Sequence, residues 1–325
     1  MSVANIIHIS PTPLVGAPSK ISNSLNKVGY ESSAVALTDY PKNGPLYKKF
    51  TEDVTVLADS SREQLDVVYS QIERADIIHV HNDLPRQTVD LVLKLNTRAN
   101  FIYQVHSPLR EGPLYYERAE TIDLPFSSHL VVAQYQPRHY QSYRAVPNLV
   151  DFKHGVSLRE DGQKLKVIFS PSHSRDGRWN AKYSEKVEKD LRALVQLGKI
   201  DLIWPETPLH PKELMNLRKS AHVTIDEVVT GAFHQVSLEG LCAGNVTINR
   251  ADFFSKAIFA QCTISKEMPP FLYADETSLS KVLLDLADSP SLTREMQSRS
   301  FEYFDKNMKS TDLVGNFTDV YNKIS

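Results

Sequence analysis

Strand-like and helix-like segments alternate along almost the whole chain, and this pattern restricts the fold more than any other feature. Short apolar runs at 5–10 (NIIHIS), 76–81 (DIIHVH) and 165–170 (LKVIFS) are separated by longer amphipathic stretches such as 62–75 (REQLDVVYSQIERA). Apolar strands that alternate with helices are typical of parallel sheets covered on both faces. The sequence therefore predicts an α/β fold.

The same pattern continues through both halves of the chain. Further strands are expected at 32–37, 100–106, 128–133, 144–146, 199–204, 221–226 and 245–249. Helices are expected at 20–29, 85–99, 184–198, 210–220 and from 276 to the end. A proline–asparagine turn at 145–152 (AVPNLVDF) leads into a polar stretch at 153–164, which is typical of a linker. With 325 residues, we expect two Rossmann-like domains, 1–150 and 151–325, with a cleft between them. A C-terminal helical tail is expected, its last helix packing back on the N-terminal domain.

Composition indicates a soluble protein. Lys+Arg 37 against Asp+Glu 39 leaves a net charge of −2, so there is no overall basic field for nucleic acid or an anionic membrane. The only two cysteines, Cys242 and Cys262, lie among apolar neighbours and are expected to be buried free thiols in a reducing compartment. The N-terminus lacks the basic flank of a signal peptide, and no apolar run approaches the roughly 20 residues of a membrane span. A cytoplasmic location is expected.

Several nucleotide signatures are missing from the sequence. There is no Gly-x-Gly, no P-loop, no Gly-x-Ser-x-Gly elbow, no Cys-x-x-Cys and no Asp-x-Asp pair. If phosphates bind, backbone amides and cationic side chains must therefore hold them, without a metal.

Residues 223–249 (VTIDEVVTGAFHQVSLEGLCAGNVTIN) supply such a feature. The sequence reads strand, glycine turn, short helix and strand, so the turn presents unpaired amides and the positive end of a helix dipole to an anion. Glu239 lies in that helix, where a carboxylate can accept hydrogen bonds from two adjacent hydroxyls, as on a ribose. The alternative is a half-buried glutamate paired with a lysine, in a helix that only packs.

A basic loop at 169–182 (FSPSHSRDGRWNAK) follows the first strand of the second half. It offers Ser172, His173, Arg175, Arg178 and Lys182, and arginine and lysine are suited to phosphate oxygens. The alternative is a solvated basic loop. Two anion-suited features at strand ends of one half favour a nucleotide site.

Here the sequence resembles a known family. The stretch VTGAFHQVSLEGLCAGNVTI is similar to the donor-binding motif of GT-B retaining glycosyltransferases, particularly family 4, whose usual form is close to E-G-F-P-L-x-x-L-E-A-M-A-x-G-x-P-V. AVPNLVDF resembles that family's interdomain I-P-N-G-V-D. DIIHVHN and VHSPLR resemble its strand ends, and 13–32 (PLVGAPSKISNSLNKVGYES) resembles its first loop and helix. The resemblance runs along nearly the whole chain.

The resemblance implies roles in binding a nucleotide-sugar donor, with a UDP- or GDP-sugar expected. Glu239 would hold the ribose hydroxyls. Arg175 and Lys182 would neutralise the diphosphate leaving group, assisted by His173 or Ser172. Backbone amides would face the donor sugar and pyrophosphate at Gly231, Ala232, Phe233 and His234.

The first domain would complete the reaction. His106 would contact the sugar near its reacting carbon, and Gly16 would allow close approach in the first loop. The implied enzyme retains anomeric configuration and needs no cofactor or metal, with leaving-group stabilisation as its main device. The acceptor is expected to be a hydroxyl, in a glycan or, as a less favoured alternative, in a hydroxylated DNA base.

One position departs from the family pattern. The motif usually carries two glutamates with seven residues between them, and the first falls at Gly231, while His234 stands at the family's proline. Because that first glutamate normally meets the transferred sugar, Asp226, Glu227 or His234 is expected to substitute for it.

Two alternatives of other kinds remain open. His79, His81 and Asp83 form H-x-H-x-D, the opening of a zinc metallo-hydrolase motif, although Leu84 follows where another histidine is common. The departure at Gly231 also suits a non-catalytic protein that binds sugar nucleotides.

Overall fold

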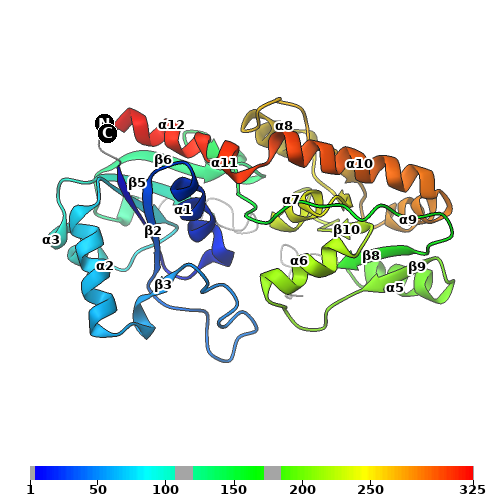
Figure 1. The fold of residues 1–325 in the computed structure, drawn as a ribbon, viewed down its shortest axis with the longest axis horizontal. Coiled ribbons are helices and arrows are strands. Elements are labelled where there is room, and N and C mark those ends of the chain that lie inside the picture. The colour runs from blue at the N-terminus through cyan, green and yellow to red at the C-terminus, as the bar shows by residue number, and fades with distance from the viewer. Residues whose placement is uncertain (1–3, 107–119, 172–183, 325) are drawn as a thin grey trace. The chain divides into compact units, whose positions relative to one another are not determined.

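The computed structural model describes residues 4–106, 120–171 and 184–324 of the chain. It divides the chain into two compact units, shown in Figure 1. The first comprises Met1–Asp151 together with Ser310–Ser325, and the second comprises Phe152–Lys309. The second unit therefore ends at Lys309 rather than at the end of the chain.

The first unit is built on a seven-stranded sheet whose neighbouring strands are all parallel. Its strands are β1 (Asn5–Ser10), β2 (Glu31–Ala36), β3 (Thr55–Val56), β4 (Ile77–His81), β5 (Asn100–Val105), β6 (Phe126–Val132) and β7 (Arg144–Val146). Its helices are α1 (Ala17–Lys27), α2 (Arg62–Arg74), α3 (Arg86–Leu95), α11 (Ser310–Leu313) and α12 (Gly315–Ile324). The order β3-β2-β1-β4-β5-β6-β7 is the doubly wound arrangement, which reverses between β1 and β4.

The apolar runs of the sequence form the centre of this sheet. Ile7, Ile9, Ile78 and Val80 are buried, and amphipathic helices cover the sheet on both faces, as their periodicity predicts. Each such side chain contributes roughly 1.5–3 kcal/mol by leaving water. Strands of this kind are legible from sequence because both of their faces are apolar.

The last helix belongs to the first unit for a physical reason. Phe317 and Tyr321 of α12 are buried, and the Tyr321 hydroxyl lies 2.9 Å from His79 Nδ1 of β4. Figure 1 shows α12 over the first sheet. Packing of its apolar face therefore ties the end of the chain to the unit in which the chain began.

The second unit repeats the architecture with a five-stranded parallel sheet. Its strands are β8 (Leu165–Phe169), β9 (Ile200–Ile203), β10 (Val223–Ile225), β11 (Val246–Asn249) and β12 (Leu272–Tyr273). Its helices are α5 (Glu185–Gln196), α6 (Pro211–Lys219), α7 (Gln235–Cys242), α8 (Phe253–Gln261), α9 (Leu279–Asp288) and α10 (Pro290–Asn307). In the order β12-β11-β10-β8-β9 the reversal lies between β10 and β8, and ligands of such sheets bind outside the carboxyl ends of strands at this point.

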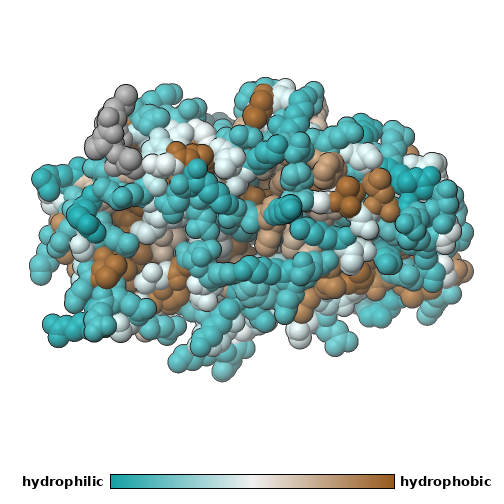
Figure 2. All heavy atoms as spheres, viewed as in Figure 1, coloured by the Kyte–Doolittle hydropathy of each residue, from teal (hydrophilic) through white to brown (hydrophobic). Residues whose placement is uncertain are grey.

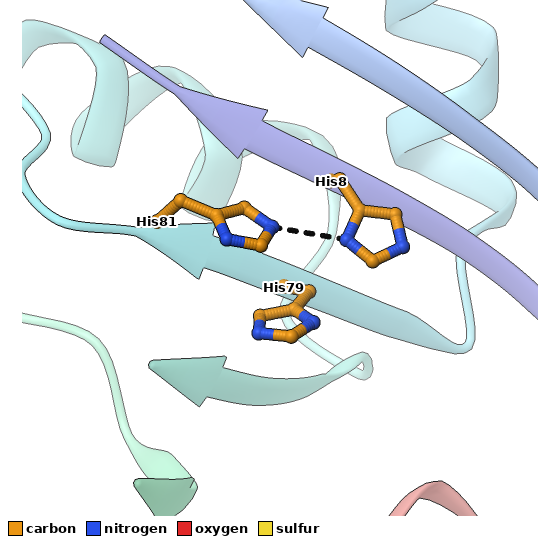
Figure 3. A group of neighbouring side chains, drawn as sticks. All are labelled: His8, His79 and His81. Carbon is orange, nitrogen blue, oxygen red and sulfur yellow. Dashed lines mark hydrogen bonds between the residues drawn. The ribbon is translucent and has the colours of Figure 1, made fainter. Parts of the chain in front are cut away.

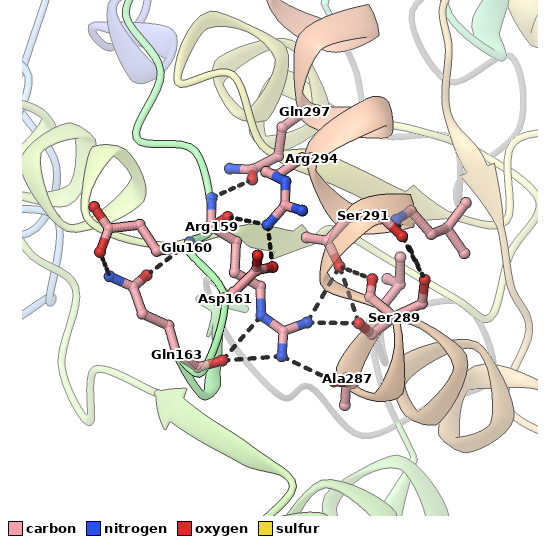
Figure 4. Close-up of polar contacts among 12 residues, drawn as sticks. Arg159, Glu160, Asp161, Gln163, Ala287, Ser289, Ser291, Arg294 and Gln297 are labelled. Atoms are coloured by element: carbon pink, nitrogen blue, oxygen red, sulfur yellow. Dashed lines mark hydrogen bonds and ion pairs between the residues drawn. The ribbon is translucent and has the colours of Figure 1, made fainter.

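A buried arginine attaches the linker to the second unit (Figure 4). Arg159 donates from Nη1 to the carbonyl of Leu286 at 2.6 Å and from Nη2 to that of Ala287 at 2.8 Å. These carbonyls belong to the last turn of α9, which has no partners within its own helix. The Arg159 amide also donates to Gln297 Oε1 on α10 at 2.9 Å. The polar stretch predicted as a linker is therefore anchored on α9 and α10 through the side chain and the backbone of Arg159.

Three elements do not follow from the sequence pattern. The strands β3 and β12 have two residues each, and α8 is apolar around much of its surface, with Phe253 71% exposed. Cys242 and Cys262 are buried free thiols, as expected. Figure 2 shows apolar side chains scattered among hydrophilic ones on the face in view. In the described ranges, none of the helices is both long and apolar enough to cross a bilayer.

Candidate functional site

The reversal point of the second sheet gathers three charged side chains and one hydroxyl from four elements. Ser170 follows β8, Asp226 follows β10, Arg218 lies on α6 and Glu239 on α7. Helix α7 lies close to the sheet because position 240 is glycine. A Cβ there would lie 2.6 Å from the Thr247 hydroxyl oxygen, closer than atoms can pack. This close approach sets the place of Glu239, the preceding residue.

Glu239 is paired with Arg218. The Arg218 side chain is 0% exposed, and its Nη1 lies 3.1 Å from Glu239 Oε2, while Glu239 is 13% exposed. Arg218 Nη2 also donates to Ser170 Oγ at 3.0 Å. Burial lowers the pKa of Arg218, and the carboxylates of Glu239 and Asp226 oppose this shift. Glu239 is therefore partly buried and paired, with arginine rather than lysine as the partner, and its role toward a ribose stays a prediction.

Arg218 was not predicted as a site residue. A signal for it exists in the sequence, since Arg218 lies three residues after Met215, and both are buried on the same face of α6. An arginine on the apolar face of an amphipathic helix needs a partner, because a buried charge is costly without one.

The hydrogen-bond capacity of Arg218 is not used up. Within the described ranges, its Nε and Nη1 have no partner with hydrogen-bond geometry, although Nη1 faces Glu239 as an ion pair. Buried donors in native structures nearly always have an acceptor, so orphans of this kind indicate a missing acceptor such as water or a ligand. The orphan donors are suited to an anion.

The turn after β10 is held by two acidic side chains. Glu227 is 0% exposed, and it accepts hydrogen bonds from the amide and hydroxyl of Thr230 and from the amide of Ala232 at 2.6–3.2 Å. Asp226 accepts from the His234 amide at 2.6 Å and from the Ser237 hydroxyl at 2.7 Å. Both carboxylates therefore shape the turn.

This arrangement corrects two expectations. The amides of Ala232 and His234 are bound by Glu227 and Asp226, so they do not point to a ligand as predicted. Glu227 is buried and binds the turn through both carboxylate oxygens, so it does not substitute for a sugar-binding glutamate as suggested. Asp226 binds the turn through Oδ2, and its substitution for that glutamate stays a prediction. The described part of the chain holds no hydrogen-bond partner for the amides of Gly231 and Phe233. His234 keeps a partly exposed side chain, with Nδ1 3.3 Å from Asp226.

Gly231 stands in the turn for a conformational reason. Its φ is +87°, a region that costs a residue with a Cβ about 1–2 kcal/mol. Nothing lies within 4 Å of where its Cβ would be, so space is not the limit. A glutamate at this position is therefore disfavoured by the backbone of this particular turn.

The basic loop lies largely outside the described residues. Ser172, His173, Arg175, Arg178 and Lys182 all fall in 172–183. The described part of the chain before this gap ends at Pro171, the residue after Ser170, whose hydroxyl oxygen accepts a hydrogen bond from Arg218.

The first-unit residues lie at the carboxyl edge of their own sheet. His106 follows β5, and its amide donates to Asn82 Oδ1 at 2.7 Å while its Nε2 lies 2.8 Å from His81 Nδ1. Burial lowers the pKa of His106 to about 4. Gly16 is the N-cap of α1 with φ +77°, and Val15 before it also has a positive φ, which is rare for a β-branched residue and typical of functional loops.

The zinc alternative is not supported by the geometry. Among the described residues, three histidines bring ligand atoms within 4.8 Å of one another, and Asp83 is not among them: His8, His79 and His81 (Figure 3). A metal must lie in the plane of each imidazole that binds it, along the nitrogen lone pair. The rings of His79 and His81 are stacked, with centroids 4.3 Å apart and planes at 22°. Nearly parallel planes share no point close to both rings.

Comparison with known proteins shows the fold. No protein-family model matches the chain, and no curated protein matches it in sequence. Among solved structures, it is similar to an alpha-glucosyltransferase in complex with UDP-glucose and DNA containing an abasic site, with a TM-score of 0.64, 10% identity and 100% of both chains covered. Sucrose-phosphate synthase from Thermosynechococcus elongatus gives 0.58 and 11%, with 98% of both chains covered. A UDP-N-acetylglucosamine 2-epimerase gives 0.54 and 12%, covering 99% of this chain and 96% of the other.

With two doubly wound parallel units and these full-length likenesses, the chain has the GT-B architecture of two Rossmann-like domains. The fold predicted from the sequence is confirmed.

Proposed function

We propose that this protein is a retaining glycosyltransferase that moves a sugar from a nucleotide-diphosphate donor, a UDP- or GDP-sugar, to a hydroxyl acceptor. The observation that carries the proposal is the buried Arg218 with orphan donors beside Glu239, at the carboxyl edge of a doubly wound sheet. Such an edge is where α/β sheets bind nucleotides. A cation with unused donors there is complementary to a diphosphate.

In this proposal Glu239 binds the ribose hydroxyls, and Arg218 holds its carboxylate in place. The Nε of Arg218 and the basic loop with Arg175 and Lys182 neutralise the leaving diphosphate, so that no metal is required. Positive charge aimed at the leaving group stabilises the transition state more than the ground state. His106 contacts the transferred sugar.

The names of similar proteins agree with this donor class. One of them is described in complex with UDP-glucose and DNA, which makes a sugar–nucleotide donor a consistent choice for this fold. We propose a glycan hydroxyl as the acceptor, since the net charge of −2 gives no overall field for DNA. A hydroxylated DNA base is tested beside it.

A ligand screen tests the donor class directly. The melting temperature is measured with UDP-, GDP-, ADP- and dTDP-sugars, and a shift with one nucleotide identifies the donor by binding linkage. Turnover is then measured as nucleotide release with glycan and hydroxymethylated-DNA acceptors, and the anomeric configuration of the product is read by proton NMR. Absence of binding by all four donors contradicts the proposal.

A second candidate is a sugar-nucleotide-binding protein without transferase activity, favoured by Gly231 at the position of the sugar-binding glutamate. One of the structures of similar fold is an epimerase, so epimerisation of the donor sugar is one activity to test for this candidate. Conversion of the donor sugar without any acceptor identifies an epimerase. Donor binding with neither conversion nor transfer identifies a non-catalytic protein.

A further inference from the structure

A chain of three histidines leads from the middle of the first sheet to its carboxyl edge. His8 on β1 and His81 on β4 are 0% exposed, and His106 follows β5. His8 Nδ1 lies 3.0 Å from His81 Nε2, and His81 Nδ1 lies 2.8 Å from His106 Nε2. The first of these bonds is drawn in Figure 3. His79, whose ring stacks on His81, contacts Tyr321 instead and is not part of the chain of bonds.

All three rings are neutral near pH 7. Burial lowers the pKa of His8 to about 3 and that of His106 to about 4, and it holds the pKa of His81 well below 6.5. A neutral imidazole carries one N–H and one bare nitrogen. Two hydrogen bonds in a row therefore allow only two arrangements, in which every proton points toward His106 or every proton points toward His8.

The surroundings of His8, at the far end of the three histidines, decide between these two proton arrangements. Within the described residues, His8 Nε2 is buried and has no partner. If the protons pointed toward His8, this nitrogen would be a buried N–H without an acceptor, which is rarer in proteins than an acceptor without a donor. With the protons pointing toward His106, His8 Nε2 is a bare nitrogen and Nδ1 donates.

The consequence reaches His106. His81 then donates from Nδ1 to His106 Nε2, so Nε2 is the bare nitrogen of His106 and the proton lies on Nδ1. Free histidine prefers the opposite tautomer, with the proton on Nε2. The buried partners His8 and His81 thus reverse the usual tautomer preference of His106.

We propose that His8 and His81 are positioning residues that hold His106 in the Nδ1–H tautomer, so that its Nδ1 is a fixed hydrogen-bond donor at the carboxyl end of β5. Used on a hydroxyl or ring oxygen of the transferred sugar, this donor deepens the proposed function and rests on it. The tautomer itself does not depend on that function.

Nitrogen NMR tests the tautomer without any substrate. In protein labelled with ¹⁵N-histidine, long-range ¹H–¹⁵N correlations distinguish protonated from bare ring nitrogens, and the His106 signals are identified by their loss in His106→Gln. We expect a protonated Nδ1 and a bare Nε2. The His81→Met variant is expected to move His106 toward the Nε2–H form. An Nε2–H tautomer in the unmodified protein overturns the proposal.

Two variants guard against a loss of folding. His8→Met removes only the far end of the chain and is expected to give mixed tautomers at His106. His79 lies on β4 beside His81 and is equally buried, but it has no hydrogen bond to the three histidines. The His79→Gln variant is therefore expected to leave the tautomer of His106 unchanged. If His79→Gln shifts the tautomer as much as His8→Met, the effect is general disturbance of the sheet and the proposal is wrong.

Kinetics separate this proposal from the proposed function. With an active donor and acceptor pair, His81→Met is expected to lower kcat about 10- to 100-fold with less effect on KM. This is less than the roughly 10²- to 10⁴-fold that a positioned acid or base contributes, because His106 itself is kept. If the tautomer is as expected but kcat is unchanged, the positioning role is wrong while transferase activity stands. If no transfer occurs at all, the NMR result still decides the tautomer.

Discussion

Replacement of Arg218 by methionine is expected to destabilise the second unit strongly. The change keeps most of the buried volume but removes the guanidinium that faces Glu239. Glu239 is 13% exposed, so its carboxylate is left largely desolvated without its cation. A broken buried ion pair typically costs 3–5 kcal/mol, because one charge stays behind.

The geometry supports that magnitude. At the 3.1 Å separation of Nη1 and Oε2, Coulomb attraction at an effective dielectric constant of about 20 is about 5 kcal/mol. Arg218 also loses its bond to Ser170, about 1 kcal/mol. Relaxation and water entry reduce the sum, so we expect a loss of about 3–4 kcal/mol in the free energy of unfolding. Replacing Glu239 by leucine as well is expected to recover at least about 1.5 kcal/mol.

The measurement is urea unfolding at pH 7 followed by tryptophan fluorescence. Trp204 lies in the second unit and Trp179 falls between the described parts of that unit's chain segment, so the first unit has no tryptophan. The control is Arg192→Met on α5, whose pair with Glu188 is 66% and 37% exposed; it should change stability by less than about 0.5 kcal/mol. Equal effects of Arg218→Met and Arg192→Met, or strict additivity in the double variant, would refute the reasoning.

Three further predictions concern stability. Gly231→Ala is expected to cost about 1–2 kcal/mol because φ is +87°, whereas Gly155→Ala, with open space and no positive φ, is expected to be neutral within about 0.5 kcal/mol; equal urea midpoints would contradict this. Acid is expected to destabilise the first unit between pH 6.5 and about 4. Burial lowers the pKa values of histidines such as His8 and His106, so in this range the unfolded chain binds protons that the folded chain does not. Each such histidine lowers the free energy of unfolding by up to about 1.4 kcal/mol per pH unit. Circular dichroism in urea at pH 7, 6 and 5 measures this, and a flat profile argues against neutral buried rings. Arg159→Met is expected to cost about 2–4 kcal/mol by leaving the carbonyls at the end of α9 unpaired, measured by tryptophan fluorescence; a midpoint equal to that of the unmodified protein would contradict the anchoring role.

The central strands could be predicted because they are buried on both faces and therefore apolar at every position, as in 5–10 and 76–81. Helix α8 was missed because its apolar residues surround it instead of forming one stripe, and periodicity is the signal that identifies a helix. Two-residue strands such as β3 are made by neighbouring strands rather than by local preference.

The candidate site was predicted in part. Glu239 stands out because a carboxylate in a small apolar helix is unusual. Its pairing with Arg218 depends on how α6 and α7 meet on the sheet, which no local pattern contains. Glu227 was one of three residues suggested to bind the sugar, but it binds its own turn at Thr230 and Ala232. A carboxylate that binds a ligand and one that holds a turn look alike in sequence. The hydrogen-bonded histidines lie on strands far apart in the sequence, so the sequence showed only the local H-x-H of His79 and His81.

The central claim is that Arg218 and Glu239 form part of a nucleotide-diphosphate site. Isothermal titration calorimetry with UDP, GDP, ADP and dTDP tests it most directly, on the unmodified protein, on Glu239→Gln and on the surface control Glu188→Gln. The account predicts that one nucleotide binds, that Glu239→Gln weakens its binding at least about tenfold, equal to about 1.4 kcal/mol, and that Glu188→Gln does not. Binding of none of the four, or equal affinity in the unmodified protein and Glu239→Gln, would contradict it.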